Sequence, residues 1–137
     1  MTRICRPRML VLALLLSLGS PSFAHGQESI RHSFQSLAGQ VVAEFQRATD
    51  GIRKPHFDIR RRDTFPDVNA EMVGMLKFEM KPKDEVGWHP VVCVFGYREG
   101  QWRFVKAFHE LPSDRPTWTE AGSWYEEIVA RAMNSSQ

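Results

Sequence analysis

The hydrophobic pattern is most distinctive between Trp88 and Glu110, where two apolar runs flank the pair Glu99-Gly100. Short loops that contain glycine commonly join the two strands of a β-hairpin. The pattern therefore predicts a hairpin with a two-residue loop, in which Arg98 pairs with Gln101. The rest of the chain is expected to supply further strands at the edge of this hairpin and helices over one of its faces.

The predicted register divides the hairpin side chains between two faces. It places Cys93 opposite Lys106, and aromatic residues gather on the face that is expected to form the core. That face carries Val91, Cys93, Phe95, Tyr97, Trp102, Phe104 and Phe108. The other face is of mixed character and carries Val92, Val94, Arg103, Val105, Ala107 and His109. A slip of one residue would exchange the two sets, so the aromatic clustering decides the register.

The segments around the hairpin predict two more strands and two helices. Apolar residues recur in steps of three and four between Ile30 and Ala48, which predicts a helix over Ser29–Thr49. Alternation over Ala70–Lys81 predicts a strand with one buried face. The weaker alternation over Pro55–Phe65 predicts an edge strand. A closing helix extends to about Met133, and its start is left open between two capping-box patterns that begin at residues 117 and 123.

This order of elements predicts the fold class. Helices at the two ends of a run of strands with short connections are typical of α+β proteins, and strands that alternate with helices would indicate a parallel sheet instead. We therefore predict an N-terminal helix packed on a curved antiparallel sheet of three to four strands, with a C-terminal helix.

The first 24 residues predict a secretory signal peptide. Three arginines precede the apolar run Met9–Leu18, and Ser22-Phe23-Ala24 offers small residues at the positions that a signal peptidase reads. The apolar run is about half of the ~20 residues needed to cross a bilayer, so no membrane span is expected once the leader is removed. The domain organisation is then a signal peptide over 1–24 and a single α+β domain over 25–137. The localisation is exported, either periplasmic or extracellular.

Charge and cysteine content narrow the function classes. The chain has 18 lysines and arginines against 16 acidic residues, and three of the arginines lie in the leader. The mature domain is therefore nearly neutral, and no nucleic-acid partner is expected. Arg60, Arg61 and Arg62 form a local basic group, which is either a solubilising edge or a site for an anionic partner. Cys93 alone remains after the leader, so no disulfide framework is expected, and its place between two valines favours a buried side chain over a nucleophile.

The candidate catalytic residues are His89, His109 and Glu110, at the open end of the hairpin. If Pro90 pairs with His109, the two histidines are close but on opposite faces. No metal-ligand spacing accompanies them, so no metal site is predicted. Glycine-rich phosphate loops and known nucleophile motifs are absent as well, and no cofactor is expected. The candidate ligand-binding residues are Arg103, Val105, His109 and Trp118, on the mixed face and in the loop that follows it.

The segment Tyr97–Val105, which reads YREGQWRFV, resembles the strand–turn–strand of small secreted bacterial proteins with a cystatin-like or NTF2-like curved sheet. The resemblance extends over about residues 29–110. It implies a fold that hosts ligand-binding proteins, assembly modules and a few enzymes. Our leading hypothesis is an exported non-enzymatic binding or protein-interaction domain, whose partner is a protein, a small molecule or a second copy paired through the 55–65 edge strand. The alternative is a small cleft enzyme with histidine and glutamate acid–base residues.

Overall fold

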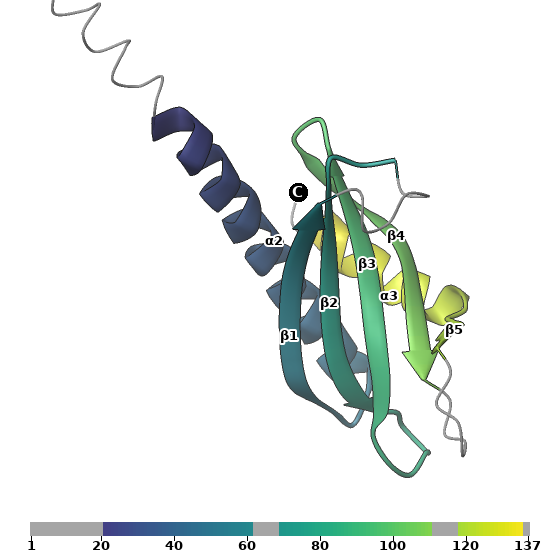
Figure 1. Ribbon diagram of the computed structural model, residues 1–137. Coiled ribbons are helices and arrows are strands. Elements are labelled where there is room, and N and C mark those ends of the chain that lie inside the picture. The colour runs from purple at the N-terminus through teal and green to yellow at the C-terminus, as the bar shows by residue number, and fades with distance from the viewer. Residues whose placement is uncertain (1–20, 62–68, 111–117, 136–137) are drawn as a thin grey trace, which may run out of the picture. The chain divides into compact units, whose positions relative to one another are not determined.

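The computed structural model describes residues 21–61, 69–110 and 118–135, with side chains from residue 26 onward. The elements in chain order are helix α2 (Pro21–Ala48), strands β1 (Gly51–Arg61), β2 (Met72–Lys81), β3 (His89–Arg98), β4 (Gln101–Glu110) and β5 (Trp118–Glu120), and helix α3 (Ser123–Ser135) (Figure 1). The chain divides into two compact units, residues 1–33 and 34–137. In the first unit, the Ser33 hydroxyl donates a hydrogen bond to the Ile30 carbonyl within α2. The sheet, α3 and the part of α2 from Phe34 onward form the second unit.

The predicted α+β class with an antiparallel sheet is confirmed. The five strands lie in the order β1-β2-β3-β4-β5, so each strand pairs with its neighbour in the sequence. The expected number of three to four strands is wrong because β5 adds a three-residue edge beside Phe108–Glu110 of β4. A strand this short has too few residues to show alternation in the sequence. The expected curvature is also not found, since the sheet is not curled.

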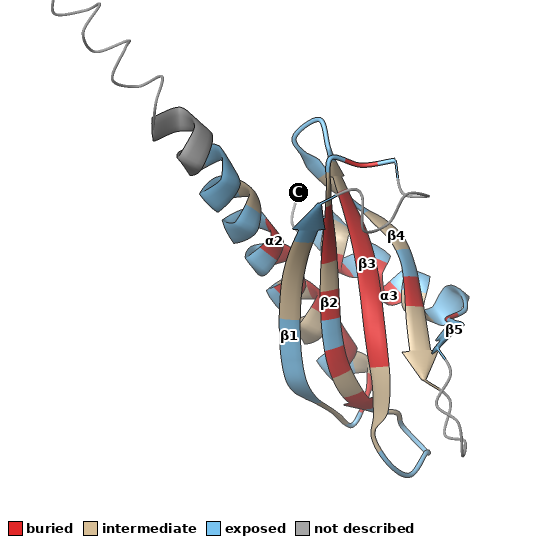
Figure 2. Cartoon of the chain, viewed as in Figure 1, coloured by how far each residue is buried: buried red, intermediate tan, exposed pale blue. Residues whose placement is uncertain are grey.

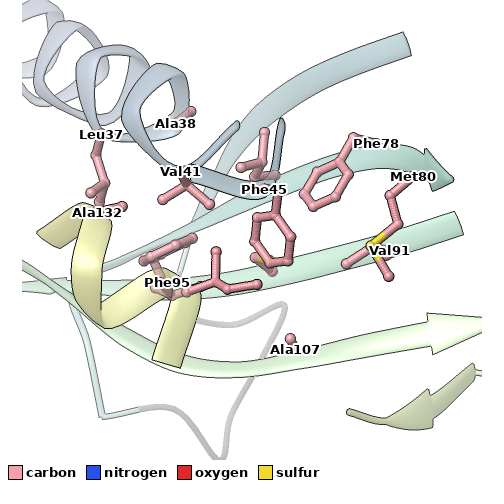
Figure 3. Close-up of a cluster of buried hydrophobic side chains, with 14 of the residues drawn as sticks. Leu37, Ala38, Val41, Phe45, Phe78, Met80, Val91, Phe95, Ala107 and Ala132 are labelled. Atoms are coloured by element: carbon pink, nitrogen blue, oxygen red, sulfur yellow. The ribbon is translucent and has the colours of Figure 1, made fainter. Parts of the chain in front are cut away.

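Helix α2 has the predicted apolar stripe but begins earlier than predicted. It starts at Pro21, a residue that fits the first turn because its missing N–H is not needed there, so Ser29 lies within the helix rather than at its start. From residue 34 onward, its stripe packs against β2, β3 and β4 in one buried cluster (Figure 3). The helix ends at Ala48, and the buried Thr49 hydroxyl donates a hydrogen bond to the Phe45 carbonyl, at 2.6 Å.

Strand β1 lies at the sheet edge, as predicted, but it spans Gly51–Arg61 rather than 55–65. Its first residues pair with the end of β2, and a bulge between Arg53 and His56 takes up one extra residue. Lys54 has a φ of 55° in this bulge. Bulges of this kind bend an edge strand, which lets β1 continue through Pro55 without a regular ladder there. Residues 62–65 of the predicted strand lie outside the described residues.

The β3–β4 hairpin has the predicted loop but not the predicted register throughout. Glu99 and Gly100 both have positive φ, as a two-residue hairpin loop requires, and Arg98 pairs with Gln101. A bulge then shifts the ladder by one position. It lies between Val94 and Phe95 of β3, and Val105 is the extra residue in β4. Cys93 consequently lies opposite Ala107, not Lys106.

The bulge corrects the predicted division of faces at the end of β4. Ala107 belongs to the buried cluster under the helices, which we call the core face of the sheet, and His109 lies opposite Val91 on that same face. Phe108 moves to the other face, which we call the second face. Every position from Gln101 to Phe104 keeps its predicted partner, because these residues precede the bulge.

Helix α3 begins at Ser123, the second of the two capping-box positions. The first pattern was misleading, since Trp118–Glu120 is strand β5. Ile128, Val129 and Ala132 are buried in the cluster shared with α2 and the sheet, so the C-terminal helix packs on both. Figure 2 shows the resulting burial, which is greatest along β3 and decreases toward the edge strand β1.

The second face is not plain surface. Val73, Val92 and Val94 are buried there, and partly buried apolar side chains pack around them: Met75, Val105 and Phe108. Because β3 is buried on both faces, its sequence reads as a continuous apolar run rather than an alternating one.

Candidate functional site

A cavity of about 640 Å³ opens where the β2–β3 connection, the last residues of β4 and the first turn of α3 meet. We call it the histidine cavity. It is lined by Ala48, Met80, Pro82, Lys83, Glu85, His89, His109, Trp124 and Tyr125. Its volume lies within the range of roughly 300–1,000 Å³ that is usual for small-molecule sites.

His89 is the first residue of β3 and pairs with Met80 of β2. Its ring nitrogen Nε2 lies 3.5 Å from Oε2 of Glu85, a residue of the β2–β3 connection. The Glu85 side chain is 61% exposed, and that of His89 is 19% exposed. The pair therefore places a histidine at the cavity wall and its carboxylate partner at the solvent rim.

His109 enters the cavity because of the bulge at Val105. Its ring stacks on that of Tyr125, with centroids 5.7 Å apart and planes within 7° of parallel. Its Nδ1 atom is buried and has no hydrogen-bond partner among the described residues. Most buried polar side-chain atoms are hydrogen-bonded, and an unpaired one is costly. His109 is therefore a residue of the cavity lining whose ring carries an unsatisfied nitrogen.

Tyr125 and Trp124 supply the aromatic wall from the first turn of α3. Burial, with smaller contributions from the Cys93 thiol and the Glu85 carboxyl, raises the pKa of Tyr125 to about 12. The phenol therefore stays protonated and neutral near pH 7. Trp124 meets Tyr125 edge to face, with centroids 4.9 Å apart, and is 40% exposed. The wall combines flat apolar surface with polar groups at its border.

The structure brings together two of the three candidate catalytic residues. His89 and His109 share the cavity, and the expectation that they lie on opposite faces is wrong because the bulge turns His109 to the core face. Glu110 does not line the cavity, since it follows His109 in the strand and pairs with Trp118 of β5. Glu85 is the carboxylate that the cavity contains instead.

The four candidate ligand-binding residues do not form one group. Arg103 is exposed opposite Gly96, and Val105 packs with the valine cluster of the second face. Trp118 is exposed, but it lies in β5 rather than in the predicted loop. Among the four, His109 alone lines the histidine cavity. Sequence reasoning missed four lining residues, namely Lys83, Glu85, Trp124 and Tyr125. For Lys83 and Glu85, the available signal was that the β2–β3 connection leads directly to His89.

Cys93 is fully buried, and this burial raises the pKa of its thiol to about 12. A thiol that is protonated and shielded from solvent at neutral pH is a poor nucleophile, so its expected structural role agrees with its position. Across residues 21–61, 69–110 and 118–135, no group of three or more histidine, cysteine, aspartate or glutamate side chains is placed to hold a metal ion.

The basic residues of β1 are largely engaged by neighbouring groups. Arg60 Nε lies 3.0 Å from Asp58 Oδ2, and this hydrogen bond lowers the pKa of Asp58. Arg53 Nε lies 2.6 Å from Glu79 Oε2, and its guanidinium group stacks 4.3 Å from the ring centroid of Trp88. Within the basic group, Arg60 therefore has a carboxylate partner, Arg61 is exposed, and Arg62 lies outside the described residues.

No helix in the described part of the chain is long and apolar enough to cross a membrane. Comparison with known proteins adds no relative, since no family model, no curated protein and no solved structure matches the chain.

Proposed function

We propose that this protein is an exported, non-enzymatic binding domain that holds a small molecule in the histidine cavity. The observation that carries the proposal is a cavity of about 640 Å³ lined by His109, whose buried Nδ1 has no hydrogen-bond partner among the described residues. Ligand sites are typically concave and largely apolar, with a few converging polar groups that fix the orientation of the ligand. The histidine cavity combines these properties at the meeting point of four separate chain segments.

Export rests on the leader pattern of residues 1–24. A binding role also agrees with the positions of the polar cavity residues. Glu85, which partners His89, is mostly exposed, so it is poorly placed to hold a catalytic histidine in one orientation.

A cavity-filling variant tests the proposal. Ala48 lines the cavity at the end of α2, and Ala48→Phe should fill part of it. Ala130→Phe is the matched control, since Ala130 is exposed in α3 and does not line the cavity. A diverse fragment library is screened by NMR against the unchanged protein, and the hits are titrated into both variants.

We expect some fragments to bind and to shift the resonances of His89, His109 and Tyr125. Their binding should be lost in Ala48→Phe and retained in Ala130→Phe. Circular dichroism checks that both variants fold. The proposal is refuted if no fragment binds, or if binding to the folded Ala48→Phe variant is unchanged.

One observation favours a second candidate, a small cleft enzyme. His89 and His109 line the same cavity, so one could accept a proton while the other donates one. Turnover of a chromogenic ester such as p-nitrophenyl acetate, lost in both His89→Gln and His109→Gln, would support the enzyme over the binding domain. Equal rates in the protein and the two variants would remove it.

A further inference from the structure

We infer that the histidine cavity takes a planar aromatic monoanion, that is, a one- or two-ring compound with a carboxylate. This inference rests on the proposed binding function and goes further by naming the chemical class of the ligand. It follows from the charge and the shape of the cavity wall.

The charge of the wall favours an anion. The basic side chains of the lining are Lys83, His89 and His109, whereas Glu85 is its single carboxylate. Glu85 already has a neighbouring group, since its Oε2 lies 3.5 Å from Nε2 of His89. Lys83 makes no ion pair with another residue of the described chain. The Lys83 ammonium group therefore has no ion-pair partner among the described residues, and an incoming carboxylate would be attracted to it.

The shape of the wall favours a flat ring system. The stacked His109 and Tyr125 rings form one surface, and Trp124 meets Tyr125 at an interplanar angle of 89°. Met80 and Ala48 add apolar surface. Aromatic rings bind well against such walls, either offset and parallel to a ring or with their edge toward it. Methionine also makes favourable sulfur–aromatic contacts.

The same features disfavour the other ligand classes. A cation would meet Lys83 and would have to compete with His89 for Glu85. A metal ion lacks a set of three ligands within the described residues. A long acyl chain would have to place apolar surface beside Lys83, both histidines and Glu85, which costs free energy unless those polar groups keep their water.

Three ligands that share an indole ring isolate the role of charge. Indole-3-acetate is the anion, indole-3-acetamide is its neutral isostere and tryptamine is a cation. Isothermal titration at pH 7 and low salt measures the affinity of each for the full chain. Hydrogen bonds to a charged group are stronger than neutral ones by about 1–1.5 kcal/mol, so we expect indole-3-acetate to bind about tenfold tighter than the acetamide. Tryptamine should bind more weakly than both.

Two variants identify the groups that recognise the anion. His109→Phe keeps a ring against Tyr125 but removes both nitrogens, and it should weaken the acetate by about tenfold and the acetamide by less. Lys83→Gln removes the uncompensated charge, and it should weaken the acetate by about threefold because Lys83 is exposed. Lys77→Gln is the control, since Lys77 is an exposed lysine of β2 that does not line the cavity, and it should leave all three affinities unchanged.

The outcomes separate this inference from the function on which it rests. Equal affinities for indole-3-acetate and indole-3-acetamide would overturn the ligand class and leave the binding function standing. The same holds if other fragments bind in the cavity and none of the three indoles does. If nothing binds in the cavity, the binding function fails and the inference fails with it.

Discussion

Replacing Gly74 with alanine should destabilise the protein, although alanine is ordinarily the better strand residue. Gly74 lies in β2, and a Cβ atom added there would be 2.6 Å from two carbons of the Phe34 ring. The ring cannot easily move away, because Phe34 is fully buried and three aromatic rings surround it. Its centroid lies 5.8 Å from that of Phe57, 5.6 Å from that of Phe95 and 4.6 Å from that of Trp102.

The magnitude follows from two opposing effects. Forcing an extra methyl group into a well-packed core typically costs about 1–3 kcal/mol. Removing a glycine from a strand interior returns about 0.5–1 kcal/mol, because glycine loses more backbone entropy on folding. The net expectation for Gly74→Ala is a decrease of about 1–2 kcal/mol in the free energy of unfolding.

Urea unfolding followed by far-ultraviolet circular dichroism measures this change, and two further variants make the result specific. Gly39→Ala is the control, because no atom lies within 4 Å of an added Cβ at this helical position, and it should stabilise the protein by about 0.5–1 kcal/mol. Phe34→Leu should cost less in the Gly74→Ala background than in the parent, since the smaller side chain relieves the clash. The reasoning is refuted if Gly74→Ala is neutral or stabilising while Gly39→Ala behaves as expected.

Three other predictions concern titration and register. Burial raises the pKa of Cys93 from 9.0 to about 12, so the thiol ionises first in the unfolded chain, and the free energy of unfolding falls as pH rises from about 9 to 12. By pH 10.5 this decrease is about 2 kcal/mol, and it should be absent in Cys93→Ala when both proteins are unfolded in urea. An unchanged pH profile in the variant would contradict the prediction. The hydrogen bond from Arg53 lowers the pKa of Glu79, so acid should weaken folding less in Glu79→Gln than in the parent, and equal acid unfolding curves would argue against that pair. Deleting Val105 removes the extra bulge residue but no ladder pair, so nuclear Overhauser contacts from His109 to α3 should persist, and their loss would show that the bulge itself holds this ring.

The sequence predicts the elements of this fold well where the pattern is local. The stripe along α2 and the Glu99-Gly100 loop depend on spacings of a few residues, and both agree with the structure. The segment after Phe104 is different, because apolar side chains occur at both odd and even positions of the strand. Either Ala107 or Phe108 could face the core, and alternation does not decide between them. The clustering of aromatic residues led to the prediction that Phe108 faces the core. In the structure, Ala107 packs in the core under the helices instead.

The candidate site was predictable only in part, for a related reason. His89 and His109 stood out as titratable residues at one end of the hairpin, and both line the cavity. Tyr125 and Trp124 come from a helix whose starting residue the sequence left open, so their position against β4 could not be derived. Glu110 was predicted as a site residue because it is adjacent to His109 in the sequence, but it does not line the cavity.

The bulge at Val105 connects the core to the site through a chain of contacts. It places the small Ala107 in the buried cluster that also contains Ile128 and Val129 of α3. The Ala107 carbonyl then accepts a hydrogen bond, 2.8 Å long, from the Ala121 N–H, two residues before α3 begins. That bond fixes where the first turn of α3 lies along β4, and Tyr125 in this turn stacks on His109. With Val105 as the extra residue of the strand, Ala107 packs in the core, and His109 reaches both the cavity and the Tyr125 ring.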